Sequence, residues 1–430
     1  MAEDYTLRRV PPAARHGWRT VAVQSFGQAG NIGLLMLGAL LGISLGFWPA
    51  AGVLVLGLVI QTVALLAMGT MGMREGLATT VLTRWTGLGR YGSAILGLVL
   101  ACCVTGWFGV LNTVVAQGLH TIVGGPTWVW ALIAGAGITA IVMFGFTVMA
   151  RTAAVTAPAF LALSAYLAVT QLWDRPLAEP AGGMSIPAGV TAVVGVWIIG
   201  IVVAPDITRF TRDRADVVRL TVFGTVLGQL LIGLCGIALA LAFQTKDVVA
   251  IVTAGSGLLG IAVLITATAN IQNLNLYVGT LSLANALDTL IGRRPGPRLL
   301  TVLLGALGAI ASATGILSTV DSLLAVLAGV LPPVVGIATA EYYVVRRWRP
   351  LLAESRPSGE LPAPPPAWVP SALVIWVVTA AIGLLAPWGV PALNALLPAF
   401  ALTVLVGWAS RARAARRSRL SPARPRSPRC

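Results

Sequence analysis

The chain is a series of long apolar segments separated by short polar gaps, and this pattern limits its possible folds more than any other feature. Charged residues make up only 10% of it, against about 25% in soluble domains. The segments show no period-two alternation, which excludes a membrane β-barrel. We therefore predict an all-α polytopic membrane protein with about 12 transmembrane helices, at 20–45, 49–72, 92–118, 128–149, 153–173, 189–207, 217–243, 255–288, 299–316, 320–345, 369–386 and 391–410.

The basic residues predict how these helices are oriented. With the amino terminus inside, 27 of the 29 basic residues lie in inside gaps and tails, and only Arg175 and Lys246 lie outside. Basic residues favour the cytoplasmic side of a membrane, so we predict a multi-pass protein of the inner cell membrane with both termini in the cytoplasm. The formal charge of +15 therefore indicates topology and contact with the lipid bilayer, and we predict no nucleic-acid partner.

The gaps also divide the chain into regions. We predict a cytoplasmic segment (1–19), a ten-helix core (20–350), a stiff Pro-rich cytoplasmic linker (351–368), two additional helices (369–410) and a basic, disordered tail (411–430). The first 19 residues lack the apolar core of a cleavable signal peptide. Four cysteines and two histidines show no metal or redox spacing, so we predict no cofactor, no catalytic residues and no obligatory protein partner.

The first segment carries amides and glycines where lipid-facing residues are expected. These are Gln24, Ser25, Gly27, Gln28, Gly30, Asn31 and Gly33. Polar groups inside a membrane need partners, and glycine weakens a helix interior. The pattern predicts a broken helix whose free backbone groups line a cavity, with Gln28 as a candidate substrate contact. Further along, the spacing of Gly38, Gly42 and Gly46 is typical of close helix packing.

The sixth segment has a second set of helix-breaking residues. Gly195 and Gly200 permit an unwound stretch, and Pro205 removes a helix hydrogen bond. Asp206 and Arg209, three residues apart, are expected to pair in a structural or gating role. The two interrupted helices are five segments apart, which a 5+5 inverted repeat would produce, with repeat one at about 20–173 and repeat two at about 189–345.

The eighth segment contains four amides within six residues, at 270, 272, 273 and 275. An unpaired buried amide costs a few kcal/mol, so these side chains are expected to face partners or a cavity. Primary amides offer adjacent donors and acceptors, which suits the edge of a heterocycle. Trp107, flanked by glycines in the third segment, and Trp197 offer flat indole faces for stacking such a ring. Plain packing is the alternative for both tryptophans.

At these residues the chain resembles the nucleobase:cation symporter-1 family, and the bacterial cytosine permeases most closely. The matching stretches occur in family order and cover most of residues 15–350. They are 76–84, Gly106-Trp107-Phe108-Gly109, 194–197 with Asp206-Ile207-Thr208-Arg209-Phe210, 273–277 with 283–285, and 331–333 with 341–343.

The resemblance implies a leucine-transporter-like fold and cation-driven uptake of a nucleobase-like heterocycle. It implies stacking of the ring between Trp107 and Trp197, and hydrogen bonds from the backbone at Gly195 and Val196. It also implies hydrogen bonds from the amide region at Asn270, Gln272 and Asn273.

The sequence departs from the family at two places. Cytosine permeases carry a Gln three residues before the third-segment Trp, and Val104 stands there in this chain. Sodium-coupled members carry a hydroxyl pair in segment eight, where Asn270 and Ile271 stand here. The candidate cation ligands are Gly27, Asn31, Thr266 and Asn270, and the coupling ion is either sodium or a proton.

Several functions therefore stay open at this stage. The small-molecule substrate is cytosine, a purine or a related pyrimidine, or alternatively a thiamine-precursor pyrimidine, allantoin or a hydantoin. A membrane-embedded enzyme would need a cluster of carboxylates, His or Lys near the headgroups, and no such cluster is evident. A channel or receptor without coupled transport is a third possibility.

Overall fold

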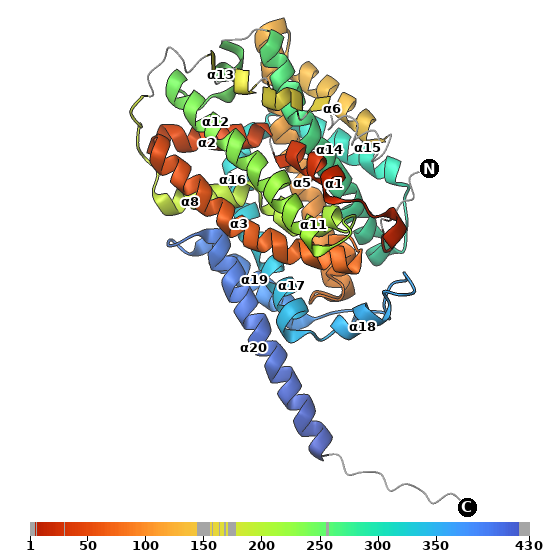
Figure 1. Cartoon of the computed structure of the whole chain (residues 1–430). Coiled ribbons are helices and arrows are strands. Elements are labelled where there is room, and N and C mark those ends of the chain that lie inside the picture. Colours follow the sequence, from red (N-terminus) through yellow and green to blue (C-terminus); the bar gives the residue numbers. More distant parts are fainter. Residues whose placement is uncertain are drawn as a thin grey trace, which may run out of the picture.

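The computed structural model describes residues 5, 7–29, 31–143, 155–156, 158–162, 164–166, 169–170, 178–254 and 258–420. Every regular element in these ranges is a helix, and the helices form one bundle from which α20 projects (Figure 1). The first half contains η1 (Pro12–Ala14), α1 (Trp18–Ala29), α2 (Ile32–Leu45), α3 (Phe47–Glu75), α4 (Thr79–Leu82), α5 (Gly89–Val123) and α6 (Thr127–Met143).

The second half begins with a helix broken into three short pieces. Its elements are α8 (Ile186–Val196), α9 (Ile198–Val202), α10 (Ala204–Thr208), α11 (Arg214–Arg219), η2 (Leu220–Val226), α12 (Leu227–Phe243), α13 (Val248–Ala254), α14 (Leu258–Ile291), α15 (Pro297–Ala313), η3 (Ile316–Thr319), α16 (Val320–Val330), α17 (Pro332–Thr339) and η4 (Ala340–Val345). The chain then continues through α18 (Arg349–Glu354), α19 (Pro370–Leu385) and α20 (Pro391–Leu420).

Helix lengths agree with a membrane-embedded bundle. Within the described ranges, five helical spans are long and apolar enough to cross a membrane, and five shorter apolar helices accompany them. The helices within the first and sixth predicted segments are short because each segment is interrupted, and both interruptions were predicted from the sequence. The fifth predicted segment, 153–173, is described only at 155–156, 158–162, 164–166 and 169–170, and these residues are helical.

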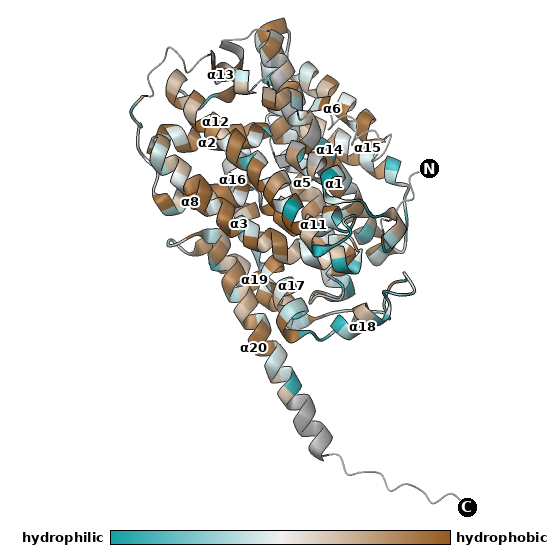
Figure 2. Ribbon diagram, viewed as in Figure 1, coloured by the Kyte–Doolittle hydropathy of each residue, from teal (hydrophilic) through white to brown (hydrophobic). Residues whose placement is uncertain are grey.

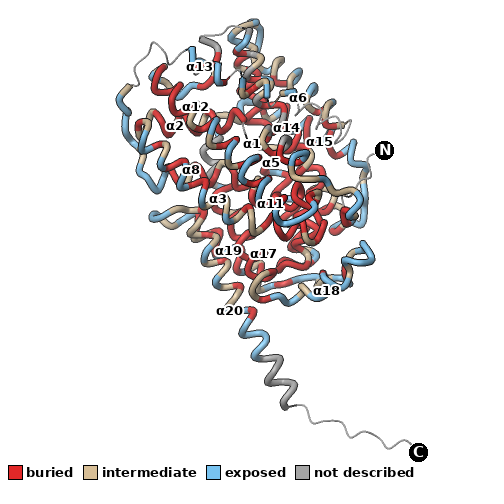
Figure 3. The backbone as a smooth tube through the Cα atoms, viewed as in Figure 1, coloured by how far each residue is buried: buried red, intermediate tan, exposed pale blue. Residues whose placement is uncertain are grey.

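The outward faces of the bundle are apolar. Val63 on α3 and Val377 on α19 are 69% and 70% exposed, and apolar residues follow these helices along the outside of the molecule (Figure 2). The burial pattern shows the same helices with one buried and one exposed side (Figure 3). A soluble protein rarely exposes so much contiguous apolar surface, so these faces suit contact with lipid.

Two long helices form the centre of the bundle. α5 has 35 residues and α14 has 34, which at 1.5 Å per residue is about 50 Å each. Both are longer than a bilayer core requires, as predicted from the sequence, and they pack against each other. They carry Trp107 and the amides of segment eight into the middle of the molecule.

The glycines of α2 allow α12 to approach it at backbone distance. A Cβ on Gly42 would lie 2.8 Å from the carbonyl oxygen of Ile237, and one on Gly38 would lie 3.0 Å from the Cα of Gly236. This confirms the close packing predicted from the glycine spacing at these two positions. Gly46 has another role, since it ends α2 with φ +81°.

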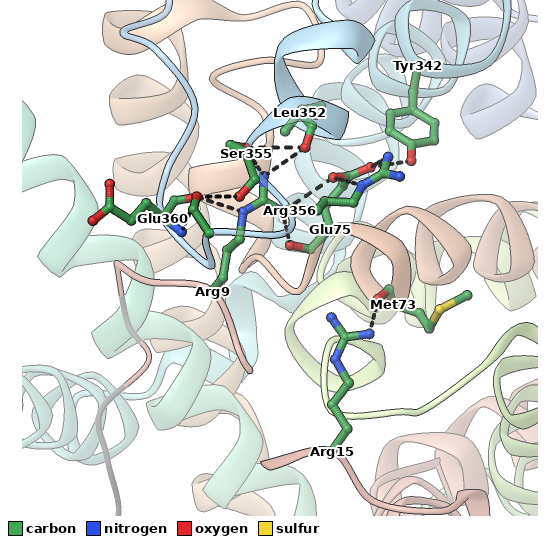
Figure 4. Close-up of polar contacts among 10 residues, drawn as sticks. Arg9, Arg15, Met73, Glu75, Tyr342, Leu352, Ser355, Arg356 and Glu360 are labelled. Carbon is green, nitrogen blue, oxygen red and sulfur yellow. Dashed lines mark hydrogen bonds and ion pairs between the residues drawn. The ribbon is translucent and has the colours of Figure 1, made fainter. Parts of the chain in front are cut away.

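A buried carboxylate joins three chain segments at one end of the bundle (Figure 4). We name it the Arg-rich end, because Arg9, Arg15 and Arg356 lie close together there. Glu75, at the end of α3, accepts hydrogen bonds from Arg356 Nε at 2.9 Å and from the hydroxyl of Tyr342 at 2.5 Å. Arg9 lies 3.4 Å from the same carboxylate. Arg9 also donates to the main-chain oxygens of Leu352 and Glu360, at 3.2 and 2.9 Å. The amino-terminal segment is thereby fixed to α3 and to the chain after η4.

The predicted linker 351–368 is a strap packed across the bundle rather than a free spacer. Trp85 donates through Nε1 to the carbonyl of Ala363 at 3.0 Å, and the amide of Tyr91 donates to Ala367 at 3.0 Å. The rings of Tyr91 and Trp368 stack with centroids 4.9 Å apart. Proline removes backbone donors, so the strap is held largely through its carbonyls.

The prediction of a disordered tail from 411 onward is wrong for its first ten residues. α20 continues to Leu420, because the sequence there is rich in Ala and Arg, which are strong helix formers. Residues 421–430 lie outside the described part. The amino-terminal segment, the strap and the part of α20 at Gly407, which packs against Val345 of η4, lie at the same end of the bundle, which agrees with both termini being on one side.

Removing the Glu75 carboxylate should destabilise the protein. The Glu75→Ala variant leaves the buried Arg9 without its counter-charge, and losing one partner of a buried ion pair costs about 3–5 kcal/mol. We expect a clear fall in the thermal unfolding midpoint of the purified chain. Glu354→Ala, which removes an exposed carboxylate on α18, is the control and should have little effect. Equal midpoints in the two variants would contradict this assignment.

Candidate functional site

The first interruption separates α1 from α2 and is held together by one side chain. Asn31 accepts a hydrogen bond from the amide of Gly33 through Oδ1, and donates through Nδ2 to the carbonyl of Gln28, both at 2.8 Å. It therefore caps α2 and binds the last turn of α1. The helix break predicted for the first segment is confirmed, with Asn31 satisfying backbone groups on both sides of it.

The second interruption is centred on Trp197. This residue has φ −111° and ψ 8° and separates α8 from α9. Its amide donates to the carbonyl of Gly195, while its indole lies against Gly200. A Cβ on Gly200 would lie 2.6 Å from Nε1 of the indole, so only glycine leaves room for the ring in this position. The predicted break at 195–200 is confirmed.

A central cavity lies between the two interruptions and the two long helices. Trp107 of α5 and Trp197 both face it, and they are only 8% and 7% exposed. The full lining is Asn31, Leu34, Val104, Trp107, Val196, Trp197, Ile199, Gly200, Val203, Ile271, Leu274, Asn275 and Val278. Both predicted tryptophans therefore face one cavity, as a stacking site requires, and Val104 makes the wall beside Trp107 apolar.

The amides of α14 divide into one that lines the cavity and others that do not. Gln272 donates through Nε2 to the carbonyl of Phe108 at 2.8 Å, which ties α14 to α5. Asn275 donates through Nδ2 to Oε1 of Gln272 at 3.0 Å and itself lines the cavity. Asn273 is 2% exposed and does not line the cavity.

The predicted substrate contacts include Gln272 and Asn273 but not Asn275, which is the amide of α14 that lines the cavity. The signal was present in the helical spacing, because Ile271, Leu274, Asn275 and Val278 follow the i, i+3, i+4, i+7 pattern of one face. What decides which face points inward is the hydrogen bond of Gln272 to Phe108, and a single sequence does not reveal it.

Other predicted contacts lie beside the cavity. Gly195 does not line it, whereas Val196 does. Gln28 lines a second cavity together with Ser25, Thr208, Thr221 and Thr225, and Trp197 and Gly200 form part of the wall of both cavities. Val203 and Leu274 also line both, so these four residues form the boundary between the central cavity and a more hydroxyl-rich one.

The predicted cation ligands are only partly described. Asn31 uses both ends of its amide within the first break, and Thr266 donates through its hydroxyl to Ala262 at 2.6 Å. Gly27 and Asn270 lie in α1 and α14, and the side-chain position of Asn270 lies outside the described part of the structure. The cation site therefore stays a prediction.

The predicted pairing of Asp206 with Arg209 is made through a main-chain carbonyl, and the ion pairs of the described residues include none between these two side chains. The carboxylate of Asp206 accepts from the amide of Thr79 at 2.8 Å. Arg209 donates to the carbonyl of Asp206 at 3.2 Å, to that of Tyr5 at 2.8 Å and to the hydroxyl of Tyr277 at 2.9 Å. Arg209 ends α10 in a right-handed helical conformation, with its amide bonded to the carbonyl of Pro205 at 3.0 Å. A structural or gating role for these residues stays a prediction.

Residues 9–408 match the family model of permeases for cytosine/purines, uracil, thiamine and allantoin. The chain belongs to this family, the nucleobase:cation symporter-1 transporters. The cytosine permease of Escherichia coli K12 is 25% identical over 358 residues, which are 81% of this chain and 83% of that one. Membership makes the protein a membrane transporter rather than an enzyme.

Solved structures of related fold agree with the architecture. Mhp1, a nucleobase-cation-symport-1 family transporter in a closed conformation with bromovinylhydantoin bound, matches with a TM-score of 0.77 at 20% identity, over 96% of this chain and 95% of Mhp1. A Na⁺-coupled sialic acid symporter matches with a TM-score of 0.70 at 12% identity, over 95% and 92%. The permease therefore has the leucine-transporter-like fold predicted from the two interrupted helices.

The contact between Gly200 and the indole of Trp197 can be tested without knowing the substrate. The Gly200→Ala variant forces the ring out of its position, and overpacking of this kind costs about 1–3 kcal/mol. We expect a lower thermal unfolding midpoint than for Gly137→Ala, because no atom lies within 4 Å of a Cβ at Gly137. Midpoints that fall equally in both variants would refute the packing role of Gly200.

Proposed function

We propose that the protein imports a flat, nucleobase-like heterocycle that stacks between Trp107 and Trp197. One observation carries the proposal: two buried tryptophans and the amide-bearing Asn275 line a single cavity between the two helix breaks. Stacking of a base on an aromatic side chain contributes about 1–3 kcal/mol. Cytosine, a purine and a related pyrimidine all have the flat ring that this arrangement suits.

Polar recognition of the ring would come from Asn275, while Trp107 and Trp197 offer their flat faces. The Oδ1 of Asn275 accepts a ring N–H or NH₂, because its Nδ2 is already bonded to Gln272.

The second cavity supplies a path away from the site. Trp197 lies between the central cavity and the one lined by Gln28, Thr208 and Thr221. A shift of this indole would connect the two, and the substrate would then leave toward the Arg-rich end, which is the predicted cytoplasmic side. Movement in the opposite sense would close the path, as alternating access requires.

A cation gradient would drive the transport, with sodium or a proton as the coupling ion. For sodium, the proposed ligands are the backbone of Gly27 with Asn31, Thr266 and Asn270. A bound cation between the first break and α14 would stabilise the arrangement that binds the ring.

Val104 supports a second group of substrates. Its apolar side chain lines the cavity three residues before Trp107, where cytosine permeases of the family carry Gln. A ring that places a non-polar edge at this wall binds without leaving a polar group unpaired. Hydantoins, allantoin and thiamine-precursor pyrimidines therefore belong in the same uptake panel.

The stacking site predicts a specific loss of transport. Trp107→Ala and Trp197→Ala should each reduce saturable uptake of the accepted heterocycle at least about tenfold, since each removes a stacking face. The measurement is accumulation of labelled heterocycles in cells or proteoliposomes with an imposed sodium or proton gradient. Collapsing the gradient should abolish accumulation.

The matched control is Trp48→Ala, since Trp48 is 80% exposed on the outside of the bundle, and it should transport like the wild type. Unchanged uptake in both Trp107→Ala and Trp197→Ala would refute the proposed stacking site. An internal heterocycle concentration that never exceeds the external one, despite the imposed ion gradient, would instead favour a channel.

A further inference from the structure

A third cavity lies at the Arg-rich end of the bundle, away from the transport site. It opens between α3, α11, η4 and α18, which neighbour one another in the fold (Figure 1). Its lining is Leu66, Ala67, Thr70, Arg74, Arg214, Val218, Tyr343, Arg346 and Arg349. It shares no lining residue with the two cavities at Trp197.

The four arginines of this cavity have no acidic partner among the described residues. None of the nine lining residues is a carboxylate, and none of the ion pairs of the described chain includes Arg74, Arg214, Arg346 or Arg349. The nearby carboxylates are already bonded elsewhere. Glu341 pairs with Arg347 at 3.9 Å.

Two acidic side chains next to Arg214 are also engaged. Asp213 caps α11 by accepting from the amide of Asp216, and the carboxylate of Asp216 lies 3.8 Å from Arg219. Four guanidinium groups around one cavity repel one another unless an anion compensates them. Guanidinium groups bind phosphate oxygens in a bidentate way, so a phosphate-bearing ligand is the chemical match.

The cavity continues onto an apolar surface. Val63, Leu66, Thr70 and Arg74 follow one face of α3 at helical spacing, and this face leads from the arginine end toward the middle of the bundle. Val63 is 69% exposed, and Val218 on the opposite wall is 40% exposed. A free phosphate would use only the charged end, whereas a lipid would use the charged end and the apolar face together.

We propose that this cavity, named here the arginine cavity, binds the phosphodiester headgroup of an anionic phospholipid, with an acyl chain along Val63 and Val218. Basic pockets between helices on the cytoplasmic side of a membrane are suited to anionic headgroups. The bound lipid would join α3 of the first repeat to α11 and η4 of the second and to α18. It would thereby stabilise the arrangement of the two repeats at this end of the bundle.

The test compares lipid binding by the purified full-length chain and two charge-matched variants. Arg74→Gln/Arg214→Gln removes two arginines of the cavity. Arg293→Gln/Arg298→Gln removes two exposed arginines, one in the gap after α14 and one in the first turn of α15, and serves as the control. Bound phosphatidylglycerol is measured by mass spectrometry under non-denaturing conditions, with phosphatidylcholine and inorganic phosphate as competitors.

We expect the cavity variant to bind phosphatidylglycerol about 30-fold more weakly, from the effect of two arginines on anionic lipid. The control should bind like the wild type, and neither competitor should displace the lipid. Equal binding by the two double variants would overturn the proposal. Displacement by inorganic phosphate alone would show a free-anion site and refute the lipid assignment.

If the double variant does not fold, two single variants provide the test. The single variants Arg74→Gln and Arg214→Gln each remove one charge and should each weaken phosphatidylglycerol binding about fivefold. Wild-type binding by both single variants would contradict the arginine cavity as the site. The unliganded unfolding midpoint of each variant separates loss of binding from loss of the fold.

Discussion

The structure depends on how two interrupted helices satisfy their backbone groups inside an apolar bundle. A membrane interior leaves unpaired amides and carbonyls without water. At the first break the side chain of Asn31 bonds to Gln28 on one side and to Gly33 on the other. At the second, the amide and carbonyl of Trp197 bond to Gly195 and Ile201. Because local groups satisfy both breaks, a central cavity can exist between them.

The surrounding packing fixes where these breaks lie. Backbone-level contact of α2 with α12 through Gly38 and Gly42 positions the helix after the first break. Gly33, two residues past Asn31, leaves room for Trp107, whose ring carbon Cζ2 would lie 3.3 Å from a Cβ there. At the Arg-rich end, Glu75 joins the amino-terminal segment to the strap after η4. Glycine thus leaves the space that Trp107 occupies. The ion pairs of Glu75 hold the amino-terminal segment and the strap against α3.

Much of this arrangement could be predicted from sequence, because it follows from composition and spacing. Long apolar runs predicted the helices. Glycines predicted both breaks, together with amides at the first and with Pro205 at the second. The flat indole faces of Trp107 and Trp197 predicted their place at the cavity. Helix rotation was harder to predict, because one bond of Gln272 to Phe108 turns Asn275 rather than Asn273 toward the cavity. Long-range contacts were also missed. Asp206 binds the amide of Thr79, which is 127 residues away, and no local pattern indicates that pairing.

The central claim is that a flat polar ring binds between Trp107 and Trp197, and thermal unfolding of the purified protein tests it most directly. A panel of nucleobases, hydantoins, allantoin and pyrimidines is added with and without sodium. A ligand that binds only the folded state at 100 times its Kd stabilises it by about 2.7 kcal/mol. We predict that at least one ring raises the midpoint of the wild type and that this rise disappears in Trp107→Ala. A panel without any shift, or a shift that persists in that variant, would contradict the account.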